Sequence, residues 1–264
     1  FPKFPSINIC RVKGLSKVVA MACGQDHCLV VNATGGVFSW GAGEDGQLGL
    51  LPDPECDQYR PRWAHILCII PVIQVACGNS HSLALTKDVF SWGQNSHGQL
   101  GLGKEVSLQY TPVLIHSLIG VAVSQIAAGA EYTLVLTLPG LVYCCGANKV
   151  GQLGLNRPLI CRFNICMVPA LRPLGVSFIS CGEAHTAVLT KDGKVFTFGD
   201  GRHGQLGHNS SGNEVRPRLV EGLGGRASQI CNCVLSQHIY LFIYFWAFCQ
   251  SSVNPFLKGV IFNY

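Results

Sequence analysis

The tetrapeptide Gly-Gln-Leu-Gly occurs four times in this chain at an almost constant spacing. The copies begin at residues 46, 98, 151 and 204, so that successive starts lie 52, 53 and 53 residues apart. A period of about fifty residues is typical of a propeller, a solenoid or another array of like units. We therefore expect a row of similar units, each packed on its neighbours. The sixteen residues are Gly46, Gln47, Leu48, Gly49, Gly98, Gln99, Leu100, Gly101, Gly151, Gln152, Leu153, Gly154, Gly204, Gln205, Leu206 and Gly207.

Other residues recur in step with the tetrapeptide. Upstream of each copy stands a Gly whose third following residue is His27, His81, Tyr132 or His185. A second Gly ends an apolar stretch at Trp40-Gly41, Trp92-Gly93, Cys145-Gly146 and Phe198-Gly199, and a proline follows at Pro61, Pro112, Pro169 and Pro217. These landmarks predict units at 18–67, 72–118, 123–171 and 176–223. We interpret 1–17 as the end of a preceding unit, with Ile7–Leu15 as its last strand, and 227–264 as an aborted fifth unit followed by an apolar tail.

Each unit reads as four short strands. In the second unit these are Val72–Cys77, Ser82–Thr86 with the alternation of a half-buried strand, Val89–Gly93, and a last strand that starts at Pro112. Lys87-Asp88 and Lys191-Asp192-Gly193 are expected turns between second and third strands. No unit shows helical periodicity, so the predicted fold is all-β: a partial β-propeller of about four four-stranded blades. The Leu of each tetrapeptide is expected to be a buried plug between glycines at tight backbone positions.

These motifs resemble the repeats of the regulator of chromosome condensation family. The resemblance covers about 18–223 and implies a propeller related to that family's seven-bladed ring. Ser39–Gly43, Asn95–Glu105 and Cys181–Lys191 are more closely similar to the propellers of small HECT-type ubiquitin ligases. In those ligases a HECT domain with the catalytic cysteine follows the propeller. Nothing in this sequence resembles a HECT domain, so the chain would hold the propeller part and no catalytic residue.

The resemblance implies three functions. The first is a protein-interaction module that recruits substrates to a HECT-type ubiquitin ligase or localises it, with ubiquitination substrates or regulators as partners. The second is a guanine-nucleotide exchange factor for a small GTPase. That activity uses a wedge inserted in one blade, and no unit here is long enough to hold one. The third is a stand-alone scaffold.

Charge and cysteine content bear on partners and compartment. The net charge of +5 arises at the two ends of the chain, since residues 1–17 and 224–264 contain basic residues and no acid. The repeats are close to neutral, which argues against strong nucleic-acid binding. Cys23, Cys77 and Cys181 share one repeat position and read as small buried hydrophobes. No signal peptide is recognisable, so we expect a cytoplasmic location, with a nuclear one as the alternative.

Several motifs imitate functional sites. Residues 41–46 and 199–204 fit the G-x-G-x-x-G dinucleotide pattern, but no helix follows either one, so no cofactor is expected. No metal is expected, because the cysteine pairs lack partner pairs at zinc spacing. The recurring His27, His81 and His185 are interpreted as structural, each ring bonding backbone within its own unit.

The repeat pattern fails after residue 233, and Ile239–Cys249 is an unbroken apolar and aromatic run. Three interpretations compete for this tail: a divergent blade, a membrane segment, and a sequence foreign to the evolved protein, such as a retained intron. Eleven strongly apolar residues are fewer than the roughly 20 needed to span a bilayer. The abrupt loss of the pattern favours the third, and membrane association is not expected.

Overall fold

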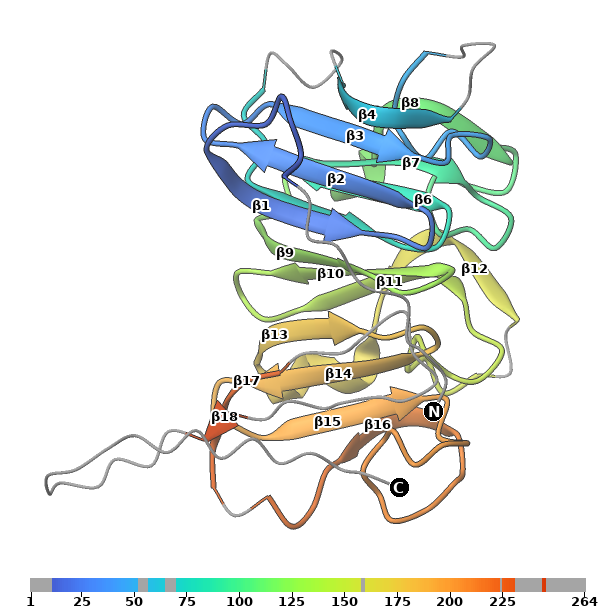
Figure 1. The fold of residues 1–264 in the computed structure, drawn as a ribbon. Coiled ribbons are helices and arrows are strands. Elements are labelled where there is room, and N and C mark those ends of the chain that lie inside the picture. The colour runs from blue at the N-terminus through green and yellow to red at the C-terminus, as the bar shows by residue number, and fades with distance from the viewer. Residues whose placement is uncertain are drawn as a thin grey trace, which may run out of the picture.

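Four antiparallel sheets, each of four strands, follow one another along the chain and stack face to face (Figure 1). The computed structural model describes residues 11–51, 57–64, 70–157, 160–223 and 225–230, together with the backbone of 244–245. Each sheet is a meander in which strands pair in sequence order. The all-β partial propeller predicted from the repeat is confirmed, and each sheet is called a blade below.

The strands of one blade occupy one repeat. Blade one contains β1 (Val18–Cys23), β2 (His27–Asn32), β3 (Val37–Gly41) and β4 (Gln58–Trp63). Blade two contains β5 (Gln74–Cys77), β6 (His81–Leu85), β7 (Val89–Gln94) and β8 (Leu108–Leu114). Blade three contains β9 (Val123–Ala128), β10 (Tyr132–Thr137), β11 (Val142–Ala147) and β12 (Cys161–Met167). Blade four contains β13 (Val176–Cys181), β14 (His185–Thr190), β15 (Val195–Gly199) and β16 (Glu214–Leu219).

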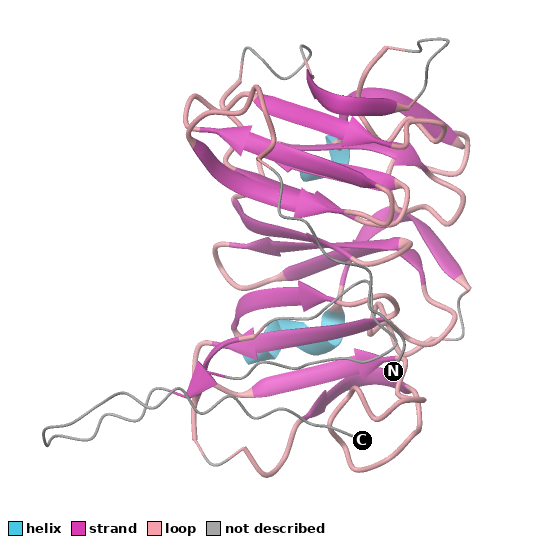
Figure 2. Cartoon of the chain, in the orientation of Figure 1, coloured by secondary structure: helices cyan, strands magenta, loops and turns pink. Residues whose placement is uncertain are grey.

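The second strand of a blade is the most deeply buried. Every residue of β6, β10 and β14 is buried, because each of these strands is flanked by strands of its own sheet and packed on a neighbouring sheet. Alternate side chains therefore enter two different interblade cores. Leu83 and Leu85 belong to the cluster shared with blade three, whereas Ala84 belongs to the cluster shared with blade one. Figure 2 shows these stacked sheets with almost no helix between them.

The fourth strands depart from the sequence prediction. β8 begins at Leu108, so Pro112 lies inside the strand and not at its start. A proline is tolerated there because β8 is the edge strand of its sheet and a register shift falls opposite, between Ser91 and Gly93. In blade three the landmark proline was misassigned: β12 ends at Met167, and Pro169 begins the short 3-10 helix η3 (Pro169–Leu174).

The predicted hairpin turns are confirmed. Lys87-Asp88 lies in the short link between β6 and β7, where the Thr86 hydroxyl accepts a hydrogen bond from the Asp88 amide at 3.0 Å. Residues 191–194 link β14 to β15 in the same way, with Gly193 at φ +81°. A second 3-10 helix, η2 (His116–Leu118), lies between blades two and three.

The two ends of the chain are described only in part. Residues 7–10 of the expected strand at Ile7–Leu15 lie outside the described residues, and residues 11–15 contain no strand. The fifth unit begins with β17 (Ala227–Gln229), which pairs with β18 (Tyr244–Phe245). The rest of the apolar run at 239–249 lies outside the described residues. Within the described part of the chain, no helix has the length and apolar character needed to cross a bilayer.

Candidate functional site

Two of the recurring histidines, His27 and His81, join one blade to the next. Nε2 of His27 lies 2.8 Å from the hydroxyl of Ser82, and that hydroxyl donates to the backbone carbonyl of Gln47 at 2.8 Å. His81 repeats the arrangement one blade later: its Nε2 lies 3.0 Å from Thr133 Oγ1, which donates to the Gln99 carbonyl at 2.7 Å. We call this three-group arrangement the ring joint.

The ring joint defines the tautomer of the imidazole. The one hydroxyl proton of Ser82 is directed at the Gln47 carbonyl, which cannot donate, so Nε2 of His27 must carry the proton that bonds the hydroxyl. The same reasoning holds for His81. For His27 and His81 this corrects the sequence-based interpretation, because these two rings bond a side chain of the following unit and not the backbone of their own.

The glycine three residues before each histidine makes room for the ring. A Cβ placed on Gly78 would collide with the His81 ring and with the backbone oxygen of Gly129 in the next blade. Gly24 and Gly182 lie against His27 and His185 in the same way. None of these three glycines has a positive φ, so the requirement is for space and not for backbone freedom.

Blade three uses a tyrosine in place of the histidine. The Tyr132 hydroxyl donates to the backbone oxygen of His185 at 2.5 Å and lies 3.2 Å from Thr186 Oγ1. Thr186 also lies 2.8 Å from the Gln152 carbonyl, so the loop of blade three is held by a hydroxyl of blade four as in the earlier joints. The joint therefore tolerates either ring.

Burial makes the three histidines weak bases. It lowers the pKa of His27 and of His185 to about 4, and lowers that of His81 to about 3 with a further contribution from the charge of His27. The rings are therefore neutral at physiological pH. In blade four, Nε2 of His185 is buried and has no hydrogen-bond partner among the described residues.

The Gly-Gln-Leu-Gly loop is the other half of each joint. All four leucines are buried, as the plug interpretation requires, and the two glycines of every copy have positive φ between 67° and 88°. The Leu100 amide bonds Asn95 Oδ1 at 3.0 Å, and its carbonyl accepts from Ser91 at 2.9 Å. The loop is thus tied to the strand that precedes it.

The next blade's aromatic residue closes over this loop. Trp92 is fully buried and donates from Nε1 to the Gln47 carbonyl at 2.9 Å, the same carbonyl that accepts from Ser82. A Cβ on Gly49 would lie 2.9 Å from Trp92 Nε1. The pairing of Trp-Gly with the tetrapeptide in the sequence thus reflects a contact between successive blades.

Sequence reasoning missed two sets of joining residues. One is the hydroxyl residue directly after the ring residue: Ser82, Thr133 and Thr186. The other is a glutamine near the start of a blade. The Gln74 amide bonds both the carbonyl and the amide of Ile126, at 2.9 and 3.0 Å, and Gln125 bonds Ile179 likewise at 2.8 and 2.9 Å. Their recurrence at one repeat position was the signal available.

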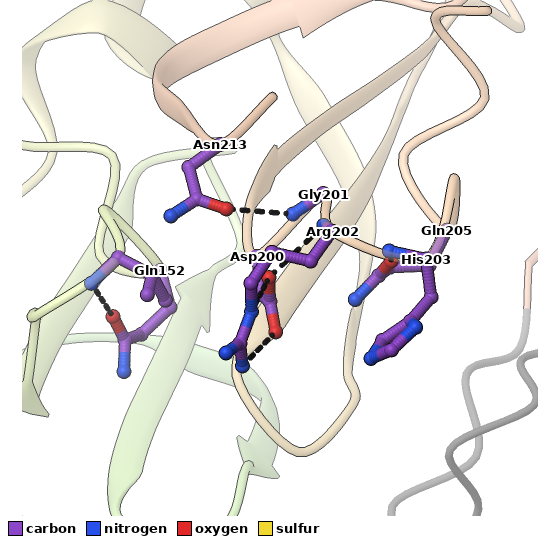
Figure 3. A network of polar contacts seen from close by, with 8 residues as sticks. Gln152, Asp200, Gly201, Arg202, His203, Gln205 and Asn213 are labelled. Atoms are coloured by element: carbon purple, nitrogen blue, oxygen red, sulfur yellow. Dashed lines mark hydrogen bonds and ion pairs between the residues drawn. The ribbon is translucent and has the colours of Figure 1, made fainter. Parts of the chain in front are cut away.

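The loop of blade four carries a polar network (Figure 3). The side chain of Arg202 forms two hydrogen bonds to the Asp200 carboxylate, at 3.0 and 2.9 Å, and the Arg202 amide forms a third at 3.1 Å. Burial opposes ionisation of this carboxyl, but Arg202 holds its pKa below the usual value. Asn213 accepts from the Gly201 amide at 3.0 Å across the loop. This network stabilises the loop without presenting a free carboxylate.

The blades present two ends of different character. In a meander, the turn between strands one and two and the loop between strands three and four share one end, which we call the loop face. Its described segments are 24–26, 42–51, 57, 78–80, 95–107, 129–131, 148–157, 160, 182–184 and 200–213. The opposite end, the turn face, contains 17, 33–36, 64, 70–73, 86–88, 115–122, 138–141, 168–175, 191–194, 220–223 and 225–226.

Charge is divided between these faces. The described segments of the loop face contain eight acids (Asp26, Glu44, Asp45, Asp57, Glu105, Glu131, Glu183, Asp200) and four bases (Lys104, Lys149, Arg157, Arg202). Those of the turn face contain six bases (Lys17, Lys87, Arg172, Lys191, Lys194, Arg226) and three acids (Asp88, Asp192, Glu221). The near-neutral repeat therefore has an acidic end and a basic end.

The described residues offer little for catalysis. No group of three or more His, Cys, Asp or Glu among them is placed to hold a metal ion. His27 and His81 are occupied in joints, and burial raises the pKa of the Cys77, Cys145 and Cys181 thiols. The arrangement suits a rigid frame that presents loops.

Comparison with known proteins places these features in a wider group. The family model for the RCC1-like domain matches residues 3–242. The human protein named probable E3 ubiquitin-protein ligase HERC6 is 49% identical over 221 residues, which cover 80% of this chain and 21% of that protein. The chain thus spans about a fifth of the length of this relative.

Two solved structures share the fold. Human WBSCR16 superposes with a TM-score of 0.76 at 30% identity, over 86% of this chain and 58% of that one. Prp20p from Saccharomyces cerevisiae, described for its binding to Gsp1p and histones, superposes with a TM-score of 0.71 over 84% of this chain and 56% of that one. Its identity is 23%, a level that shows the fold alone.

Proposed function

Because the chain belongs to the family of RCC1-like domains, we propose that it is a protein-interaction propeller that selects substrates for a ubiquitin ligase or localises it. The similarity to HERC6 supports a role in ubiquitin ligation. The absence of a metal-binding cluster among the described residues is compatible with a binding module. The ligase activity itself would belong to other parts of a longer polypeptide.

We further propose that partners dock on the loop face. The loops between third and fourth strands are much longer than the three- to four-residue turns between second and third strands, and binding residues concentrate on loops held by a rigid scaffold. Each loop is anchored by its buried plug leucine, and in blades one to three a hydroxyl of the next blade also bonds the loop carbonyl. The acidic balance of the face favours partners with basic segments, and the attraction should weaken with salt.

Exposed acids in three blades provide the test. A loop-face variant combines Glu44→Gln, Glu105→Gln and Glu183→Gln, and a matched turn-face variant combines Lys87→Gln, Arg172→Gln and Lys191→Gln. All six side chains are exposed, so both variants should fold. Each is introduced into the natural polypeptide that carries this chain, and ubiquitinated peptides are compared in cells.

We expect the loop-face variant to lose a subset of substrates while autoubiquitination is unchanged, and the turn-face variant to keep the full set. An identical substrate set in all three proteins would contradict the proposal. A first blot with an antibody to the second unit establishes whether the natural polypeptide is much larger than 28.4 kDa.

The alternative is nucleotide exchange on a small GTPase, which the fold shared with Prp20p accommodates. A nucleotide-release assay with a small nuclear GTPase separates the two functions. Clear acceleration of release by this chain would favour exchange over substrate selection.

A further inference from the structure

Blade three contains a pair of cysteines that face each other across its third and fourth strands, and the other blades have no cysteine at these two positions. Cys144 on β11 lies directly opposite Cys166 on β12, and their Sγ atoms are 3.8 Å apart. The corresponding cross-strand pairs are Ser39 with Arg62, Ser91 with Val113, and Thr197 with Arg218. In those blades the hydroxyl donates to the carbonyl of the plug leucine, at 2.7, 2.9 and 2.6 Å. In blade three a thiol replaces that hydroxyl and points to a second thiol.

The backbone permits a covalent bond between them. Opposite residues of an antiparallel pair have Cβ atoms about 4.5–5.5 Å apart, close to the roughly 3.5–4.5 Å of a disulfide. The sulfurs need to approach by about 1.8 Å to reach the bonding distance. Both cysteines lie within strands, directly opposite each other beside the register shift between Cys144 and Gly146, so rotation of the two side chains can bring the sulfurs together.

The two thiols have different surroundings. Cys144 is fully buried in the core between blades three and four, whereas Cys166 is half-buried. The hydrogen bond with Cys166, followed by burial, raises the pKa of Cys144, while the same hydrogen bond and the charge of Arg162 lower the pKa of Cys166 to about 6.

The fold itself brings Arg162 beside Cys166. In blades one, three and four a register shift pairs residues two apart on the third strand with residues four apart on the last strand. In blade three, Cys144 and Gly146 pair with Cys166 and Arg162, and such a bulge brings the two residues of the last strand close to each other. At the positions of Arg162 and Cys166, blade one has Gln58 and Arg62, which bond at 2.7 Å, and blade four has Glu214 and Arg218, which bond at 2.5 Å. The same geometry in blade three sets a guanidinium next to the half-buried thiol.

We infer that Cys166 and Cys144 form a peroxide-sensitive pair, in which Cys166 is the reacting thiol and Cys144 the resolving one. The Cys166 thiolate attacks one oxygen of hydrogen peroxide; the O–O bond breaks, the second oxygen leaves as hydroxide, and Cys166 becomes a sulfenic acid. The Cys144 sulfur then attacks the Cys166 sulfur, an S–S bond forms, and the S–O bond breaks. The released hydroxyl takes the Cys144 proton and leaves as water.

The disulfide would tie β11 to β12 at the base of the blade-three loop, residues 148–160. It would thereby close the segment that contains Gly151–Gly154 into a covalent ring. This site is independent of the proposed ligase function, because it rests on the two strands alone.

The test uses hydrogen peroxide on the full chain and four proteins. The wild type is compared with Cys144→Ser, Cys166→Ser and the matched control Cys145→Ser, whose side chain faces the Gln99 carbonyl of blade two. Serine at 144 restores the hydroxyl that blades one and two have there, so that variant should fold. Remaining thiols are alkylated, the chain is digested, and tandem mass spectra distinguish Cys144 from Cys145 and Cys166 from Cys181.

We expect a Cys144–Cys166 cross-link in the wild type and in Cys145→Ser, and its loss in the other two variants. In Cys144→Ser, trapping of sulfenic acid by dimedone at Cys166 should exceed that at the buried Cys181 by at least about tenfold, because reactivity follows thiolate content and access. A wild type without the cross-link, or a Cys166 labelled no more than Cys181, would overturn the inference.

Discussion

Three buried imidazoles should make the stability of this chain fall steeply as pH drops below neutrality. The folded-state pKa is about 4 for His27 and His185 and about 3 for His81, against 6.5 for an exposed histidine. The unfolded chain therefore binds protons that the folded chain excludes. Stability is full above about pH 6.5 and declines as the pH falls toward the folded-state values.

The magnitude follows from linkage. From pH 6.5 to pH 5, each buried ring lowers the free energy of unfolding by about 1.36 kcal/mol per pH unit, which is about 2 kcal/mol for one ring and about 6 kcal/mol for three. That is comparable to the whole stability of many domains, about 5–15 kcal/mol. Burial also lowers the pKa of His208, which adds in the same direction. The pKa of Asp200 is lowered, so its carboxylate becomes protonated, and its contribution to stability is lost, only at more acid pH.

The assay is urea unfolding followed by tryptophan fluorescence at pH 7, 6 and 5. Trp92 is a suitable reporter because it is fully buried and bonds the Gln47 carbonyl of the His27 joint. The control is His81→Tyr, because Tyr132 already fills that position in blade three without titrating in this range. We expect the variant to lose about 2 kcal/mol less than the wild type between pH 7 and pH 5. Equal losses in the two proteins, or a wild type whose stability does not change, would refute the role assigned to the rings.

Three further predictions concern the joints and the exposed ends. Leu100→Ala should destabilise the chain by about 2–5 kcal/mol, since it removes a fully buried plug; an unchanged melting temperature would contradict this. Gly78→Ala should lower the melting temperature strongly because its Cβ collides with His81, whereas Gly212→Ala, with open space and no positive φ, should leave it close to the wild-type value; equal effects would show that ring space is not limiting. The isolated chain should associate or precipitate, because Val18, Val19 and Met21 expose apolar surface on β1; a monodisperse monomer by light scattering would be the opposite result.

The repeat allowed the fold to be predicted because residues at the same repeat position have the same structural role in every blade. The period of the tetrapeptide, the strand alternation and the turn at Lys87-Asp88 each mapped onto one blade. The ends of the strands were harder to predict from the sequence. Pro112 suggested a strand start, but β8 begins four residues earlier because an edge strand can hold a proline inside it, and Pro169 lies after the end of β12. A proline marks a missing donor, and an edge strand tolerates that at more than one place.

The partners of the ring joints could not be predicted, because every repeat contains the same kinds of residue. Every unit contains a histidine or tyrosine, a hydroxyl and a loop carbonyl, so a single sequence cannot tell whether His81 bonds its own unit or the next one. The structure assigns it to Thr133 of the next blade. The cross-strand pair of Cys144 and Cys166 was equally hidden, because the residues lie 22 apart and only the sheet register brings them together.

The ring joint also has a direction. The loop carbonyl of one blade always accepts, and the hydroxyl of the following blade always donates, so each blade has an accepting side and a donating side. For this bond between carbonyl and hydroxyl, the gain or loss of one complete period leaves chemically equivalent junctions behind. A partial period, by contrast, separates the two halves of a junction. Arrays joined in this way can change length in whole steps while every remaining contact keeps its partner type.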